Sequence, residues 1–240
     1  MISDTKVVAI GGGTGLSTML KGLKLHTHNI TAVVTVADDG GSSGILRSDL
    51  GMLAPGDVRN CVSALAEVDP VMGELLNFRF KDGSLKGHSL GNLFLAALNE
   101  TSSSFDEAVK KFSHLTGVVG TVYPVTNESV TLSALLEDGR LIEGESHIGV
   151  HHDGPKNGIV KLMVNPEKPK AVDGVIKALE KADIIVLGPG SLYTSIIPNL
   201  LVDGVVDAIK KSNAVKIYVC NIMSQAGETE NYTVSDHLAA

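Results

Sequence analysis

The chain has 240 residues, of which 43% are hydrophobic and 20% charged, and this composition excludes an intrinsically disordered protein. Its formal charge of −7 and its lack of tryptophan argue against a nucleic-acid partner, because phosphate backbones select basic surfaces and single strands stack on aromatic rings. No secretory signal opens the chain and no apolar run approaches the ~20 residues that cross a bilayer, so we expect a cytoplasmic protein without membrane insertion.

A β-α-β unit is predicted at the start of the chain. Lys6–Ile10 is a short β-branched run typical of a buried strand, and Ile30–Ala37 has the same character. Between them, Thr14–Leu25 carries apolar residues at helical spacing.

A glycine-rich turn joins the first strand to the first helix. At such a junction, bare backbone N–H groups and the helix dipole bind anions, so we expect a phosphate contact here. Leu16 replaces the third glycine of a dinucleotide-binding fingerprint, and no Walker lysine follows. A tight turn without a ligand is the alternative. The candidate residues are Gly11, Gly12, Gly13, Thr14 and Gly15.

The segment from Asp38 to Gly56 is polar and glycine-rich, which predicts a long loop. Asp38 and Asp39 follow the second strand, where carboxylates bind a ribose or hold Mg²⁺ against a nucleotide diphosphate. An Asx turn is the alternative. Ser42 has the glycine spacing of a nucleophile elbow but stands too far past the strand, so a hydrolase is not expected. The further candidates here are Ser42, Ser43 and Arg47.

Helical patterns then dominate. They cover Val58–Glu67, Val71–Phe78, Leu90–Asn99 and Phe105–Leu115, and Ser104 with Glu107 matches a capping box at the start of the last. Arginine forks suit phosphates, and glycine-marked helix starts present donors. The candidate ligand-binding residues are therefore Arg59, Asn60, His88 and Asn92. The alternatives are a structural pair of Arg59 with Asp57 at the helix start and a structural role for His88.

The stretch 118–165 has a different pattern and is predicted to be an insertion. Apolar and polar residues alternate around Asp138–Gly139, which indicates a β-hairpin, and Ile159–Val164 predicts another strand. His151, His152 and Asp153 lie in a polar loop without zinc-site spacing, so we expect a solvated turn there.

The rest of the chain returns to α/β order. The predicted elements are a helix at Val172–Ala182, a strand at Asp183–Leu187, a helix at Leu200–Lys211 and a strand at Val215–Cys220. We therefore predict one α/β domain over 1–240, a doubly wound, mostly parallel sheet of the Rossmann-like three-layer type with a hairpin-bearing insertion. The capped start of a segment at the very end predicts either a truncated C-terminus or a very short last helix.

Polar, glycine-rich loops follow three of the apolar strands. In a parallel sheet such loops share the carboxyl edge, where ligands bind, so we expect them to form one site. The late loops contribute Gly188, Gly190, Ser191, Thr194 and Asn221.

Six motifs carry a family resemblance over essentially the whole chain. They are "GGGTGLS" at 11–17, "DDGGSSG" at 38–44, "GDVRNC" at 56–61, "GHSLGN" at 87–92, "GPGSLYTSIIPN" at 188–199 and "YVCN" at 218–221. With them the chain resembles the YvcK/CofD family, most of all its YvcK branch of gluconeogenesis factors. The resemblance implies a cytoplasmic regulatory protein required for cell shape and wall synthesis during gluconeogenic growth. It also implies binding of UDP-sugars such as UDP-N-acetylglucosamine, without an established reaction, and protein partners in cell-wall synthesis. A homo-oligomer is left open.

The other branch of this family contains 2-phospho-L-lactate transferases, which use a guanosine diphosphate conjugate. That branch usually carries GDRD-like and GPSNP-like motifs, from which residues 56–59 and 188–191 of this chain differ. A transferase is therefore the alternative function, and the choice between uridine and guanosine stays open.

Overall fold

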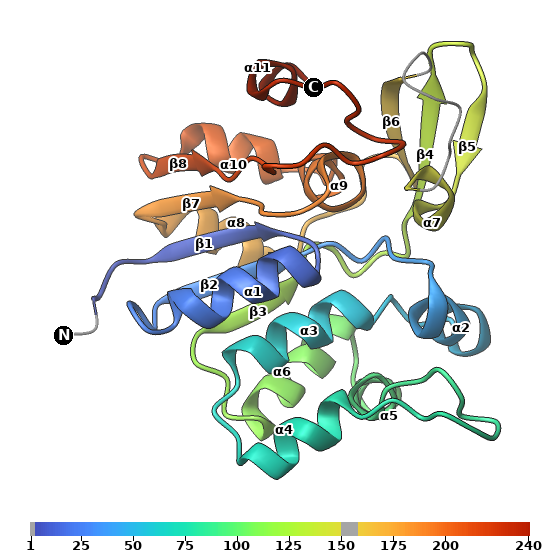
Figure 1. The fold of residues 1–240 in the computed structure, drawn as a ribbon. Coiled ribbons are helices and arrows are strands. Elements are labelled where there is room, and N and C mark those ends of the chain that lie inside the picture. The colour runs from blue at the N-terminus through green and yellow to red at the C-terminus, as the bar shows by residue number, and fades with distance from the viewer. Residues whose placement is uncertain (1–2, 150–157) are drawn as a thin grey trace.

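The computed structural model describes residues 3–149 and 158–240, and two β-sheets organise them (Figure 1). The larger sheet is parallel, with strand order β3-β2-β1-β7-β8. Its strands are β1 (Val7–Gly11), β2 (Ile30–Val34), β3 (Thr121–Pro124), β7 (Ile184–Leu187) and β8 (Val215–Tyr218). Each central strand is short, apolar and buried, as expected of a sheet covered on both faces.

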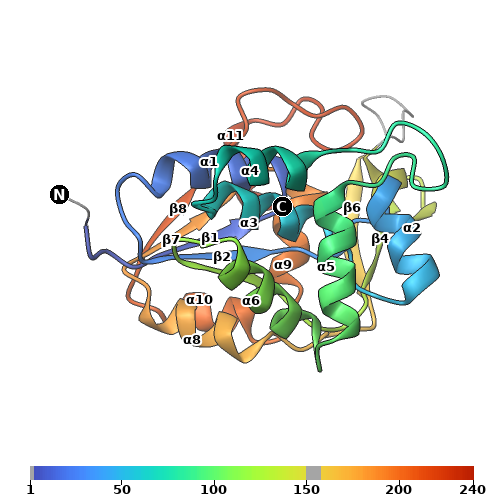
Figure 2. The same cartoon turned by 90° about the horizontal axis from the view of Figure 1, so that it is seen from below.

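Helices cover both faces of this sheet. Figure 2 shows α1 and α3 on one side and α8 and α10 on the other. Alternate residues of β1 serve the two layers: Ala9 packs in one hydrophobic core, Val8 and Ile10 in the other. The predicted doubly wound, three-layer α/β fold is therefore confirmed. The helices are α1 (Thr14–Leu23), α2 (Gly41–Leu50), α3 (Gly56–Leu65), α4 (Pro70–Asn77), α5 (Leu90–Glu100), α6 (Phe105–Leu115), α8 (Asp173–Lys181), α9 (Ile197–Leu200), α10 (Val205–Lys211) and α11 (Val234–Ala239).

A second, antiparallel sheet stands beside the carboxyl ends of the parallel strands (Figure 1). Its order is β5-β4-β6, and a four-residue helix, α7, follows β5. The predicted hairpin at Asp138–Gly139 is confirmed, with Gly139 at φ +85°. The elements are β4 (Thr131–Leu136), β5 (Leu141–Glu143), α7 (Glu145–Ile148) and β6 (Ile159–Asn165).

The segment 118–165, expected as one insertion, divides between the two sheets. Its first strand, β3, pairs with β2 in the parallel sheet, and the smaller sheet begins only at Thr131. The predicted loop with His151, His152 and Asp153 lies outside the described residues.

Helix α2 occupies part of the segment predicted to be a loop. Its composition misled the prediction, because glycine and serine have low helix propensity. The helix forms because Leu46 joins the core and Ser43 Oγ accepts the N–H of Gly56 at 3.2 Å. Gly44 is required there, since a Cβ would collide with the carbonyl oxygen of Asp39.

Two local predictions were wrong in detail. Glu107 accepts hydrogen bonds from Ser103 (N at 2.8 Å and Oγ at 2.5 Å), so the expected capping pair with Ser104 does not form. The helix expected over Leu200–Lys211 begins only at Val205, as α10, because Gly204 lies at φ +86° and Leu200 is the last residue of α9. A π-helical turn, η1 (Leu192–Ile196), precedes α9. None of the described helices has the length and apolar character that crossing a bilayer requires.

Candidate functional site

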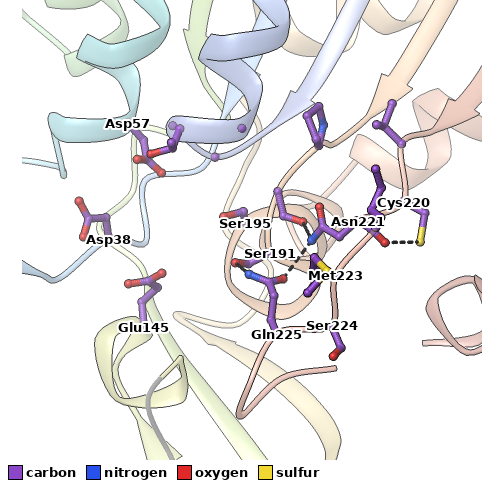
Figure 3. Close-up of a pocket in the computed structure, with 18 residues that line it drawn as sticks. Asp38, Asp57, Glu145, Ser191, Ser195, Cys220, Asn221, Met223, Ser224 and Gln225 are labelled. Atoms are coloured by element: carbon purple, nitrogen blue, oxygen red, sulfur yellow. Dashed lines mark hydrogen bonds between the residues drawn. The ribbon is translucent and has the colours of Figure 1, made fainter. Parts of the chain in front are cut away.

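A cavity of about 770 Å³ opens where the parallel strands end (Figure 3). Loops that follow β1, β2, β7 and β8 all line it, so the predicted convergence of the glycine-rich loops is confirmed. The residues predicted from sequence that line it are Gly12, Gly13, Thr14, Gly15, Asp38, Gly190, Ser191 and Asn221.

The strand order explains why the cavity lies here. From β1 the chain steps to β2 in one direction, and β7 packs on the other edge of β1. The strand order therefore reverses between β1 and β7, and such a topological switch point is the usual ligand crevice of an open parallel sheet.

Close protein contacts account for the glycines of the first loop. A Cβ on Gly12 would lie 2.6 Å from Ser195 Oγ, and one on Gly15 would lie 2.6 Å from the carbonyl oxygen of Pro189. The two loops therefore approach more closely than any larger residue permits. The tight turn expected as the alternative is thus present, and it forms one rim of a cavity.

Three carboxyl groups from three different segments line one side of the cavity. Asp38 follows β2, Asp57 lies at the start of α3, and Glu145 is the first residue of α7. Figure 3 shows them together, opposite Ser191 and Gln225. Neighbouring negative charges disfavour ionisation of each carboxyl group.

The surroundings raise the pKa of two of these groups. Burial, and then the charge of Asp38, raise the pKa of Asp57 to about 7, against hydrogen bonding from Gly13 N–H. Burial, followed by the charges of Asp38 and Asp57, raises the pKa of Glu145 to about 7. Both groups therefore change protonation near neutral pH.

Asp39 does not face this cavity, although it was predicted beside Asp38. Its Oδ2 accepts the N–H of Glu145 at 3.0 Å and its Oδ1 accepts that of Ser146 at 2.9 Å. Asp39 therefore caps α7, and both oxygens are engaged by backbone donors. In the described part of the chain no group of three or more His, Cys, Asp or Glu residues is arranged to hold a metal ion.

The two predicted arginines hydrogen-bond protein groups. Arg47 donates to the carbonyl oxygens of Asp38 at 3.1 Å and Val130 at 2.8 Å. Arg59 donates to Asn92 Oδ1 at 3.3 Å and Asn77 Oδ1 at 2.8 Å. Neither lines the cavity, so their guanidinium groups join segments of the fold.

A buried polar network lies behind the cavity wall. Ser42 Oγ is 3.0 Å from His88 Nδ1 and accepts from Asn92 Nδ2 at 3.1 Å. These three side chains connect α2 with the start of α5 and do not line the cavity. Predicted residues that the structure places outside the cavity lining are Gly11, Asp39, Ser42, Ser43, Arg47, Arg59, Asn60, His88, Asn92, Gly188 and Thr194.

Amide side chains order the opposite wall. Asn221 Nδ2 donates to the carbonyl oxygen of Gly190 at 2.8 Å and to Gln225 Oε1 at 3.1 Å, and Gln225 Nε2 donates to Ser191 Oγ at 2.6 Å. These bonds fix the loop after β8 against the loop after β7 (Figure 3).

The chain is similar to known proteins over nearly its whole length. The profile of the family described as "2-phospho-L-lactate transferase CofD" matches residues 7–240. The chain belongs to the CofD family. Within it, a gluconeogenesis factor of Bacillus subtilis is 48% identical over 238 residues, which are 98% of this chain and 73% of that protein.

Two further relatives match this chain over its full length. A protein of Thermoanaerobacterium thermosulfurigenes is 57% identical over 100% of this chain and 74% of its own length. One of Clostridium acetobutylicum is 54% identical over 100% of this chain, which spans about half (53%) of that protein. A crystal structure of a Bacillus halodurans protein of the UPF0052 family superposes with a TM-score of 0.94 at 47% identity, over 100% of this chain and 76% of that one.

Several cavity residues of this CofD-family chain were missed in the sequence. From sequence, Asp57 is expected only as the structural partner of Arg59 at a helix start. Glu145 lies 107 positions after Asp38 in a short helix without a recognisable pattern. Ser195 lies within the motif at 188–199, and the sequence pattern does not distinguish it from its neighbours. The cavity residues missed in the sequence are Asp57, Glu145, Pro189, Ser195, Val219, Cys220, Ile222, Met223, Ser224 and Gln225.

Proposed function

We propose that the chain binds a nucleotide sugar, with UDP-N-acetylglucosamine as the expected ligand. The observation that supports this is the cavity of about 770 Å³ at the switch point of the parallel sheet. Its size suits a ligand of this class, and pockets at such points in α/β sheets commonly take nucleotides.

The lining suggests how each part of the ligand is held. No Lys, Arg or His lines the cavity in the described part of the chain, so backbone N–H groups of the glycine-rich loops are the donors for the diphosphate. Asp38 would accept from ribose hydroxyls, or hold Mg²⁺ that accompanies the diphosphate. Asn221 and Ser191 offer the amide and hydroxyl groups for the base.

Isothermal titration calorimetry with UDP-N-acetylglucosamine tests this proposal. Asn221→Ala should weaken binding at least tenfold, because the loop after β8 loses its bonds to Gly190 and Gln225. Asn213→Ala removes an exposed asparagine outside the cavity and serves as the matched control. Absence of any heat with the unaltered chain would contradict the proposal.

We further propose a regulatory role in cell shape and wall synthesis during gluconeogenic growth. The support is the similarity to gluconeogenesis factors. A strain that lacks the protein should regain normal shape on a gluconeogenic carbon source when the unaltered chain is supplied, and should fail to do so with Asn221→Ala.

A transferase is the second candidate, and the description of the family profile favours it. In this case the chain would transfer a phospholactyl group from a guanosine diphosphate conjugate to a hydroxyl group of a deazaflavin acceptor. The phosphoanhydride bond breaks, a phosphodiester forms, and guanosine monophosphate leaves. Mass spectrometry of the product decides between the two, and turnover that Asp38→Asn abolishes would favour the transferase.

A further inference from the structure

Glu145 reaches the cavity from the smaller sheet. It is the first residue of α7, directly after β5, whereas the other lining residues belong to the parallel-sheet part of the chain. In the described residues no hydrogen-bond donor of the protein is paired with its carboxylate, although the group is half-buried. A half-buried acceptor that faces a cavity is available to donors of a ligand.

The Asp39 carboxylate fixes the position of Glu145. Its two oxygens accept the N–H groups of Glu145 and Ser146 at 3.0 and 2.9 Å, from 106 and 107 residues away in sequence. Gly144 has φ +95°, and a Cβ there would lie 2.7 Å from Asp39 Oδ2, so only glycine permits this approach. The Asp39 carboxylate therefore fixes the start of α7 against the loop after β2.

The chemistry of the two walls differs. The side with Asp38, Asp57 and Glu145 offers carboxyl oxygens, which repel phosphate and accept from hydroxyl groups. The opposite side offers the backbone at Gly190 and the side chains of Ser191, Asn221 and Gln225 (Figure 3). A ligand with a phosphate-bearing part and a hydroxyl-rich part therefore fits in one orientation.

We propose that Glu145 is a specificity-determining residue that accepts hydrogen bonds from hydroxyl groups of the ligand's sugar, and that Asp39 is its positioning residue. This inference rests on the proposed binding of a nucleotide sugar. It assigns the smaller sheet a role in ligand selection, exerted through one side chain of α7.

The test compares two probes, UDP-N-acetylglucosamine and UDP, which lacks the sugar. Calorimetry on the intact chain should show that Glu145→Gln weakens binding of the UDP-sugar at least tenfold and changes binding of UDP less than twofold. Glu143→Gln alters an exposed carboxylate on the neighbouring strand β5 and should leave both affinities unchanged. Asp39→Asn should lower the ratio of the affinity for the UDP-sugar to the affinity for UDP, as Glu145→Gln does. The double variant should have the same affinity ratio as Glu145→Gln alone.

Each outcome has one interpretation. Equal loss of UDP and UDP-sugar binding in Glu145→Gln, or no loss of either, overturns the role of Glu145. An Asp39→Asn chain that melts earlier but keeps the wild-type affinity ratio overturns the positioning role alone. If the unaltered chain binds neither probe, the proposed function fails and this inference fails with it, whereas binding of UDP without discrimination by Glu145 leaves the proposed function standing.

Discussion

Asp57 shows how the fold changes the chemistry of a single residue. In the unfolded chain its carboxyl has the ordinary value of 3.8, whereas burial and the nearby Asp38 raise its pKa in the folded chain to about 7. Between these two values the unfolded state releases the proton and the folded state keeps it. The free energy of unfolding therefore falls as pH rises from about 4 to about 7. Above that range the stability that the protonated Asp57 carboxyl contributes is fully lost.

Asp57→Asn should consequently stabilise the protein at alkaline pH. The amide oxygen can still accept the Gly13 N–H, while the cost of a charge in the cavity wall disappears. With ~1.4 kcal/mol per pKa unit, and a discount because Asp57 is half-buried, we expect a gain of about 2 kcal/mol at pH 8 and less than half of this at pH 4.5. Thermal denaturation at both pH values measures it. Asp49→Asn, at an exposed site on α2, is the control, and an equal gain for Asp57→Asn at both pH values would refute the explanation.

Individual site residues were predictable only where the sequence order places them after a strand. Asp38, Ser191 and Asn221 each follow an apolar run, so the parallel-sheet rule located them. Glu145 approaches from another sheet, and only the long-range contact with Asp39 brings it to the cavity. The local sequence pattern around either residue does not predict a contact between residues 106 positions apart.

At the scale of elements, hydrophobic periodicity predicted strands and helices that pack on the core, and failed where a helix is built from small residues. Helix α2 begins with "GSSG", a sequence typical of a turn. Its stability comes from tertiary contacts, among them the buried Leu46 and the close approach of Gly44 to the Asp39 backbone. Propensity is a weak guide when packing decides.

Gly44→Ala should therefore destabilise the protein, although alanine is the better helix former. The added Cβ would collide with the Asp39 carbonyl oxygen, and relief requires a shift of the loop after β2. We expect a loss of ~2 kcal/mol or more in denaturant unfolding. Gly22→Ala, in open space on α1, should instead be neutral or stabilising by up to ~1 kcal/mol. Similar effects of both substitutions would contradict this account of α2.

At the scale of the whole molecule, the alternation of strands and helices predicted the parallel sheet, whereas the association of the two sheets depends on side-chain contacts that sequence does not reveal. No strand of the smaller sheet pairs with the larger one in the described residues. The loop after β2 joins them instead: Asp39 caps α7, and Arg47 donates to carbonyl oxygens of this loop and of Val130, next to β4. The loop that borders the cavity is thus also a joint between the sheets.

Arg47→Ala should loosen the smaller sheet and leave the larger sheet intact. The substitution removes hydrogen bonds at 3.2 Å to Ala37 O, 3.1 Å to Asp38 O and 2.8 Å to Val130 O. Because water replaces most of the lost bonding, we expect the free energy of local opening to fall by ~1.4 kcal/mol, about the net value of one hydrogen bond. This fall corresponds to a tenfold larger open population, so amide hydrogen exchange in β4 and β5 should accelerate about tenfold. Amides of β1 should exchange as before, because their partners are β2 and β7. Lys21→Ala on α1 controls for loss of a surface charge, and equal acceleration in β1 and β4 would show that Arg47 stabilises the molecule globally and not the joint.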